Sequence, residues 1–155
     1  MQLKEGKKAP DFQTFDQDGK TQKLSNYFGK WILLYFYPKD DTPGCTKEAC
    51  SIRDAWPEFK KLKLQVFGIS IDGVKSHKKF ADKYDLPFTL LTDEEKEIVR
   101  KYNVWGEKSM YGRKYMGVFR TSFLIDPSGK IAKIYEKVKP EVHANEILED
   151  IKKLK

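Results

Sequence analysis

Apolar residues follow two alternating patterns along the chain. Some segments are continuous runs of β-branched and aromatic residues, whereas others repeat apolar residues every three or four positions. The longest continuous run is Trp31–Tyr37, and Leu64–Ser70 is a second one. Such runs are typical of strands that are covered on both faces of a parallel sheet. A third, shorter strand is predicted at Phe88–Thr92.

Helical periodicity fills the segments between these predicted strands. One helix is predicted to begin near Cys45 and to continue toward Leu62, with Pro57 bending or restarting it. Acidic residues in a first turn and proline at a first helical position mark two further helix starts. These two helices are predicted at Asp93–Tyr102 and Pro140–Leu154, and a helix with a polar face is predicted at Lys75–Tyr84.

Two tetrapeptide turns that end in glycine predict antiparallel hairpins. The predicted hairpins are Phe12–Phe15 with Thr21–Leu24, and Arg120–Ile125 with Ile131–Tyr135. The segment Val104–Gly117 contains three glycines and is predicted to be irregular. The order of elements predicts an α/β fold: a three-layer sandwich with a central mixed β-sheet and an N-terminal β-hairpin extension.

Length and composition indicate one soluble domain that spans residues 1–155. No apolar run approaches the roughly 18 residues that a membrane span needs, and the first residues form no apolar signal segment. We therefore expect a cytoplasmic protein with no membrane partner. The net charge is +7, but the basic residues are scattered and arginine is scarce, so we expect no nucleic-acid partner.

The chain has two cysteines, Cys45 and Cys50, and two histidines, His77 and His143. In a cytosolic protein, two close cysteines indicate redox catalysis or metal binding rather than a static disulfide. Zinc normally takes four ligands, and the histidines are isolated and expected on helix surfaces. We therefore expect no metal and no other cofactor.

The predicted strand, loop and helix place Cys45 in the first turn of a helix, at the edge of the sheet where ligands bind. The unpaired N–H groups and partial positive charge of a helix N-terminus favour a thiolate there. Thr42 precedes Cys45 by three residues, so its hydroxyl is a candidate to face the sulfur, although Thr42 taken alone is better explained as an ordinary turn or N-cap residue. Pro38 alone would simply end a strand.

Five residues along an ideal helix separate Cα atoms by roughly 8.6 Å. A disulfide requires about 4.4–6.8 Å between Cα atoms. Cys45 and Cys50 therefore cannot bond while the helix is intact. Either the two residues are never joined and Cys50 is a small core residue, or the joining unwinds a helical turn.

The segment YFYPKDDTPGCTKEAC at positions 35–50 closely resembles the peroxiredoxins, in particular their bacterioferritin-comigratory (Q-type) branch. The family pattern Pro-x-x-x-Thr-x-x-Cys falls on Pro38, Thr42 and Cys45, and the second cysteine of the branch falls on Cys50. The resemblance covers nearly the whole chain, and its further similar segments are Ser51–Asp54, Met110–Gly112 and Gly117–Asp126.

This resemblance implies a thioredoxin fold and a thiol peroxidase that reduces hydrogen peroxide and organic hydroperoxides in antioxidant defence. It implies that Cys45 is the peroxidatic cysteine and that Cys50 resolves it in an intramolecular disulfide. Thr42, Pro38 and Arg120 would support the site, because a cation beside a thiolate favours the charged form. Thioredoxin or a similar dithiol would be the reductant. We expect a monomer, with a weak dimer as the alternative.

Two other functions remain as alternatives. One is a disulfide oxidoreductase on the same fold, which the four residues between the cysteines argue against; the other is a holdase or basic binding module. Apolar residues in the segment 104–117 are expected to cover the active site, with subunit pairing as the alternative. These residues are Trp105, Met110, Tyr111, Tyr115 and Met116.

Overall fold

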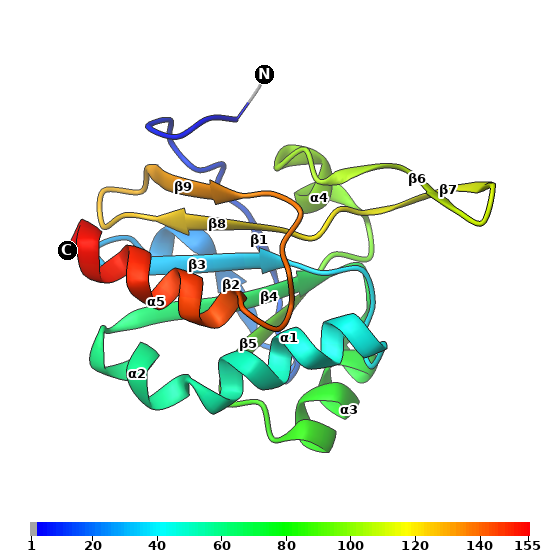
Figure 1. The fold of residues 1–155 in the computed structure, drawn as a ribbon, viewed down its shortest axis with the longest axis horizontal. Coiled ribbons are helices and arrows are strands. Elements are labelled where there is room, and N and C mark those ends of the chain that lie inside the picture. Colours follow the sequence, from blue (N-terminus) through cyan, green and yellow to red (C-terminus); the bar gives the residue numbers. More distant parts are fainter. Residues whose placement is uncertain (1–2) are drawn as a thin grey trace.

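Five strands form the central sheet of the protein (Figure 1). The computed structural model describes residues 3–155. In spatial order the strands are β5 (Thr89–Thr92), β4 (Leu64–Ser70), β3 (Trp31–Phe36), β8 (Thr121–Ile125) and β9 (Ile131–Tyr135). β3, β4 and β5 are parallel, whereas β8 is antiparallel to both β3 and β9. The sheet is therefore mixed, which confirms the prediction.

Strand β3 lies at the centre of this sheet and is buried on both faces. Leu33 and Tyr35 belong to one hydrophobic core, whereas Ile32, Leu34 and Phe36 belong to the other. Because side chains alternate across a strand, a strand with two covered faces needs no polar side. This arrangement explains the continuous apolar run in the sequence.

Helices and the N-terminal segment cover the two faces of the sheet. One core includes side chains of α1 (Pro43–Asp54), α2 (Trp56–Lys61), α3 (Val74–Tyr84) and α5 (His143–Leu154). The other includes side chains of α4 (Glu97–Lys101) and of the 3-10 helix η1 (Leu24–Tyr27), which follows the hairpin β1 (Gln13–Phe15) and β2 (Thr21–Lys23). The three layers and the N-terminal hairpin are thus confirmed. Within residues 3–155, no helix has the length and apolarity to cross a bilayer.

The predicted helix at Asp93–Tyr102 is wrong in its first turn. Helix α4 begins only at Glu97, after Lys96 in the left-handed region with φ of 60°. The Asp93 carboxylate accepts hydrogen bonds from the backbone N–H groups of Ile98 (3.1 Å) and Val99 (2.8 Å). Asp93 therefore accepts hydrogen bonds from unpaired N–H groups at the start of α4, but it lies in the preceding loop and not in the helix.

The prediction of an irregular segment at Val104–Gly117 is also wrong. Strands β6 (Trp105–Met110) and β7 (Arg113–Val118) form an antiparallel hairpin that projects from the body of the protein (Figure 1). Its two turn residues, Tyr111 and Gly112, have φ angles of 52° and 78°. Two positive φ angles in a two-residue loop match the twist of hairpin strands.

Four apolar side chains of this hairpin are exposed, and the expectation that they cover the active site stays a prediction. They are Met110, Tyr111, Tyr115 and Met116. Tyr111 at the tip is 98% exposed. Trp105 and Val118, at the base of the hairpin, pack against a core, and the Nζ atom of Lys96 lies 5.6 Å from the centre of the Trp105 ring.

The two histidines lie in the interior, which contradicts their expected place on helix surfaces. His77 lies on the buried face of α3, where its ring nitrogens contact Asp40 and the Leu91 carbonyl. His143 is the first residue of α5, and its ring contacts Glu146 and Ser122. Their burial is tolerated because every ring nitrogen has a hydrogen-bond partner.

Gly68 in β4 lies against the ring of Tyr35. A Cβ atom at position 68 would lie 2.7 Å from Tyr35 Cζ and 2.8 Å from its hydroxyl oxygen. Since Tyr35 is fully buried, we expect Gly68→Ala to lower the free energy of unfolding by about 1–3 kcal/mol, as overpacking does elsewhere. Urea denaturation with an unchanged m-value measures this loss. An unchanged midpoint would show that the Tyr35 ring moves aside without cost.

Candidate active site

Cys45 lies in the first turn of α1, beyond the C-terminal end of β3, as predicted. Thr42 is the N-cap residue, and Pro43 occupies the first helical position, where its missing N–H costs nothing. The Thr46 N–H donates to the Thr42 carbonyl oxygen at 2.8 Å and closes the first turn. The Cys45 side chain belongs to the core under α1, and the residue is 1% exposed.

Arg120 lies in the link between β7 and β8 and contacts Cys45 from there. The sequence predicted Arg120 as the first residue of the strand, whereas β8 begins at the next residue. Its Nη2 atom lies 3.4 Å from Cys45 Sγ, and its Nη1 atom donates to Glu48 Oε1 at 2.8 Å. Burial lowers the pKa of Arg120, but the interactions with Glu48 and Cys45 together raise it by more, so the net shift of the pKa is upward. The guanidinium therefore stays charged beside the Cys45 sulfur.

Glu48 is a member of the site that sequence reasoning missed. It lies three residues after Cys45 on the same face of α1 and is fully buried. Burial raises the pKa of Glu48 to about 7, although Arg120 opposes this shift. The i to i+3 spacing from Cys45 was the available signal, because residues three apart are neighbours on a helix.

Gly44 is a second residue that sequence reasoning missed. A Cβ atom at this position would lie 3.0 Å from Arg120 Nη2 and 3.9 Å from Pro140 Cγ. The absence of a side chain therefore gives the guanidinium the room to approach the N-terminal turn of α1. No pattern in the sequence near Gly44 identifies Arg120 as its neighbour.

Two buried side-chain oxygens of the described residues have no hydrogen-bond partner, namely Tyr35 Oη and Glu48 Oε2. Burial raises the pKa of Tyr35 well above its ordinary value, and the charges of Glu48 and Cys45 raise it further. Tyr35 is therefore a neutral hydroxyl. Unpaired buried polar groups are costly, and one of these two belongs to Glu48, three residues after Cys45 on α1.

Cys50 lies in the same helix as Cys45 but on a different side. Both cysteines are free, Cys45 buried and Cys50 half-buried, and α1 is intact across both. Cys50 lines a groove between α1 and α5, together with residues that include Lys47, Ala144 and Leu148. Of the two states that the spacing allows, the structure therefore shows the folded helix with free thiols.

The structure places the remaining predicted residues at the same end of β3. The Thr42 hydroxyl donates to the Lys39 carbonyl oxygen at 2.8 Å, so its hydrogen is directed into the loop. Pro38 is half-buried two residues after the last residue of β3. Arg120 is thus the only one of the three predicted supporting residues for which the described contacts include the Cys45 sulfur.

Comparison with known proteins shows the family of the chain. The model of the AhpC/TSA family matches residues 6–134. A putative peroxiredoxin bcp of Coxiella burnetii is 47% identical over 148 residues, which cover 96% of this chain and 98% of the relative. The peroxiredoxin Bcp of Bacillus subtilis is 45% identical over 152 residues, which cover 98% and 97%.

This chain belongs to the peroxiredoxins of the AhpC/TSA family. Among solved structures, the bacterioferritin comigratory protein of Xanthomonas campestris has a TM-score of 0.90 at 34% identity, and the match covers 97% of this chain and 99% of that one. The chain is a thiol peroxidase of the bacterioferritin-comigratory (Q-type) branch, with a thioredoxin-like fold.

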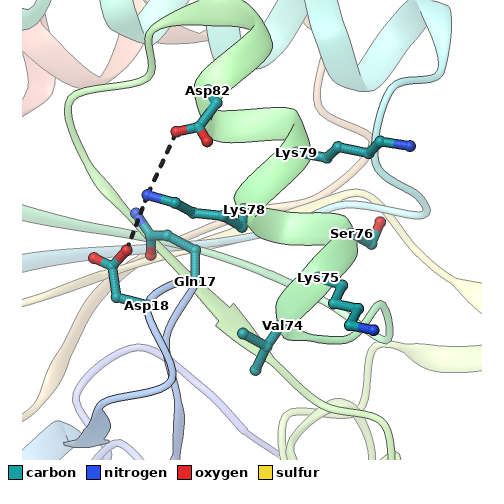
Figure 2. Close-up of a pocket in the computed structure, with 8 residues that line it drawn as sticks. All are labelled: Gln17, Asp18, Val74, Lys75, Ser76, Lys78, Lys79 and Asp82. Atoms are coloured by element: carbon teal, nitrogen blue, oxygen red, sulfur yellow. Dashed lines mark hydrogen bonds and ion pairs between the residues drawn. The ribbon is translucent and has the colours of Figure 1, made fainter.

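The large hollow on α3 of this peroxiredoxin holds none of the site residues. Its volume is about 880 Å³, and Figure 2 shows its lining, which comes from α3 and from Gln17 and Asp18. Lys78 Nζ lies 3.1 Å from Asp18 Oδ1 and 3.5 Å from Asp82 Oδ1. Exposed ion pairs of this kind contribute little to stability.

Glu48 makes the stability of this peroxiredoxin depend on pH. Because the pKa of Glu48 is raised from 4.5 to about 7, the folded protein binds this proton more tightly than the unfolded chain. The contribution of Glu48 to stability is therefore full below pH 4.5 and is lost as the pH rises toward 7. Glu48→Gln does not lose this contribution. As the pH rises from 4.5 to 7, the free energy of unfolding of Glu48→Gln should therefore increase relative to that of wild type by up to about 3 kcal/mol.

Urea denaturation of both proteins at a series of pH values measures this difference. Since the glutamine retains an oxygen that accepts from Arg120, the comparison isolates the charge. A difference between the two proteins that does not change with pH would contradict the raised pKa of Glu48.

Proposed function

We propose that Cys45 is the peroxidatic cysteine of this thiol peroxidase and that Cys50 is its resolving cysteine. The observation that carries the proposal is the Arg120 guanidinium at 3.4 Å from the Cys45 sulfur, in the first turn of α1. The Cys45 thiolate attacks one peroxide oxygen and the O–O bond breaks. The attacked oxygen keeps its hydrogen as the S–OH of the Cys45 sulfenic acid, and the leaving oxygen takes a proton from solvent and departs as water or alcohol.

Several neighbours of Cys45 bind different atoms of the peroxide. Because the Thr42 hydroxyl donates its hydrogen to Lys39, its lone pairs are left to accept from the O–H of the peroxide. The remaining N–H groups of Arg120 and the N–H groups of the helix N-terminus stabilise the charge that develops on the leaving oxygen. Pro38 shields the sulfur from water.

Resolution requires a change of local fold. The first turns of α1 unwind, and the Cys50 sulfur attacks the sulfenic acid of Cys45. A disulfide forms and water leaves. An external dithiol, thioredoxin or a similar protein, then reduces the disulfide by exchange. The two cysteines supply the electrons, so no cofactor takes part in the sequence.

Hydrogen peroxide and organic hydroperoxides are the proposed substrates. The related Xanthomonas campestris protein is described by its alkyl peroxide reduction activity, which supports the second class. We further propose that the chain works in the cytoplasm as a one-domain monomer, without a nucleic-acid or membrane partner. The scattered charge of the sequence supports this last part of the proposal.

Replacement of each cysteine tests the two roles separately. Cys45→Ser should abolish peroxide consumption, because a serine hydroxyl is not ionised at neutral pH. Cys50→Ser should consume about one equivalent of peroxide per protein and then stall with thioredoxin, leaving Cys45 as a sulfenic acid that mass spectrometry detects.

The two variants are matched controls, because each changes one sulfur to oxygen in the same helix. Substantial peroxide turnover by Cys45→Ser would remove Cys45 from the mechanism. Normal turnover of Cys50→Ser with thioredoxin would show that another group resolves the sulfenic acid.

A further inference from the structure

A buried polar network joins the loop before Cys45 to α3 and β5. Its centre is Asp40, which follows β3, and His77 of α3. His77 Nδ1 lies 2.7 Å from Asp40 Oδ2, and His77 Nε2 lies 2.8 Å from the Leu91 carbonyl oxygen in β5. His77 is 0% exposed and Asp40 is 7% exposed, so water does not compete for these contacts.

The partners of His77 determine how many protons the ring carries. The Leu91 carbonyl oxygen has no hydrogen to donate, so His77 Nε2 must donate to it. Asp40 receives two other hydrogen bonds, from the Tyr37 hydroxyl at 2.6 Å and the Ser76 hydroxyl at 2.7 Å. The Tyr37 hydroxyl lies 3.5 Å from His77 Nδ1, farther than from the Asp40 oxygen to which it donates. Donors that surround a carboxylate favour its ionised form, and an ionised Asp40 can only accept from His77, so Nδ1 donates as well.

We infer that His77 is a buried imidazolium, paired with the Asp40 carboxylate, and that this pair positions the loop that leads to Cys45. The inference extends the proposed function, since its importance depends on Cys45 being the peroxidatic residue. Asp40 lies midway between Pro38 and Thr42, the two residues that the proposed mechanism places beside the sulfur. His77 and Asp40 are thus positioning residues that do not themselves contact the peroxide.

Three contacts of Asp40 fix the loop to the body of the protein. Its carboxylate binds Ser76 and His77, both of α3. Its backbone N–H donates at 2.9 Å to Asp72, which follows β4. Movement of the loop would therefore break a buried charge pair and leave each charge uncompensated. The loop stays in place, and unwinding is confined to α1 beyond it.

A metal ion is not needed to explain this cluster. Ligand atoms of Asp40, Asp72 and His77 lie within 4.8 Å of one another. However, Asp72 Oδ2 already accepts from the Asp40 N–H and from the Ser70 hydroxyl at 2.6 Å. Since both nitrogens of His77 carry hydrogens in these contacts, no histidine lone pair is left for a cation.

Imidazole ¹⁵N–¹H NMR of the reduced protein at about pH 7.5 tests the protonation state, and His143 is an internal control. Burial lowers the pKa of His143, and its Nε2 atom lies 2.8 Å from the Ser122 hydroxyl, which can donate. We expect two protonated ring nitrogens for His77 and one for His143. The chain has no other histidine, so His77→Gln assigns the signals. An unprotonated nitrogen in His77 would overturn the inference.

A pair of adjacent aspartates tests the positioning role. Asp40→Asn removes the buried carboxylate, whereas Asp41→Asn removes an exposed one that binds Lys83 and Tyr84 of α3. In stopped-flow oxidation of reduced protein, we expect Asp40→Asn to slow the reaction of Cys45 with peroxide about tenfold, because small displacements of reacting groups are costly. Formation of the disulfide from the sulfenic acid should not slow. Asp41→Asn should stay within about twofold of wild type.

A wild-type peroxide rate in folded Asp40→Asn would overturn the positioning role. If Asp40→Asn does not fold, Tyr37→Phe removes one donor to the same carboxylate and should slow the same step to a smaller degree; an unchanged rate would then overturn the role. Failure of wild-type Cys45 to react with peroxide would instead defeat the proposed function, and the NMR result for His77 would be unaffected.

Discussion

The backbone hydrogen bonds of α1 hold Cys45 and Cys50 apart, and the chemistry of the site depends on this constraint. Helix geometry separates their Cα atoms by roughly 8.6 Å, whereas a disulfide requires about 4.4–6.8 Å. The same folded turns present Glu48 to Arg120 and a helix N-terminus to the sulfur. In the proposed mechanism the folded helix is therefore the form that reacts with peroxide, and the disulfide belongs to another local fold.

Buried charges around the helix depend on one another. Arg120 contacts both the Cys45 sulfur and the Glu48 carboxylate. Removal of its guanidinium would leave a buried carboxylate without its charged partner. On the other side of the loop, Asp40 and His77 form a second buried pair. Together these contacts fix both ends of the segment between β3 and α1. Such a framework allows one helix to unwind while the sheet beneath it keeps its register.

Local pattern was sufficient to predict the elements that are buried on both faces. β4 spans the predicted residues, and β3 ends one residue before the predicted end. Both strands were predictable because a continuous apolar run of this length is typical of a strand that is covered on both faces. The place of Cys45 followed from the order of strand, loop and helix. The β6–β7 hairpin was missed because it projects from the body and has little apolar pattern. Glu48 and the buried His77 were missed because their roles depend on partners distant in sequence.

Hydrogen–deuterium exchange of α1, in the reduced protein and after one equivalent of peroxide, tests most directly the claim that disulfide formation unwinds this helix. The reduced protein should protect the amides between Cys45 and Cys50. After oxidation, with the disulfide verified by mass, these amides should exchange rapidly, while those of β3 and β4 stay protected. Equal protection of α1 in the two forms would contradict the account, because a folded helix does not bring the two sulfurs together.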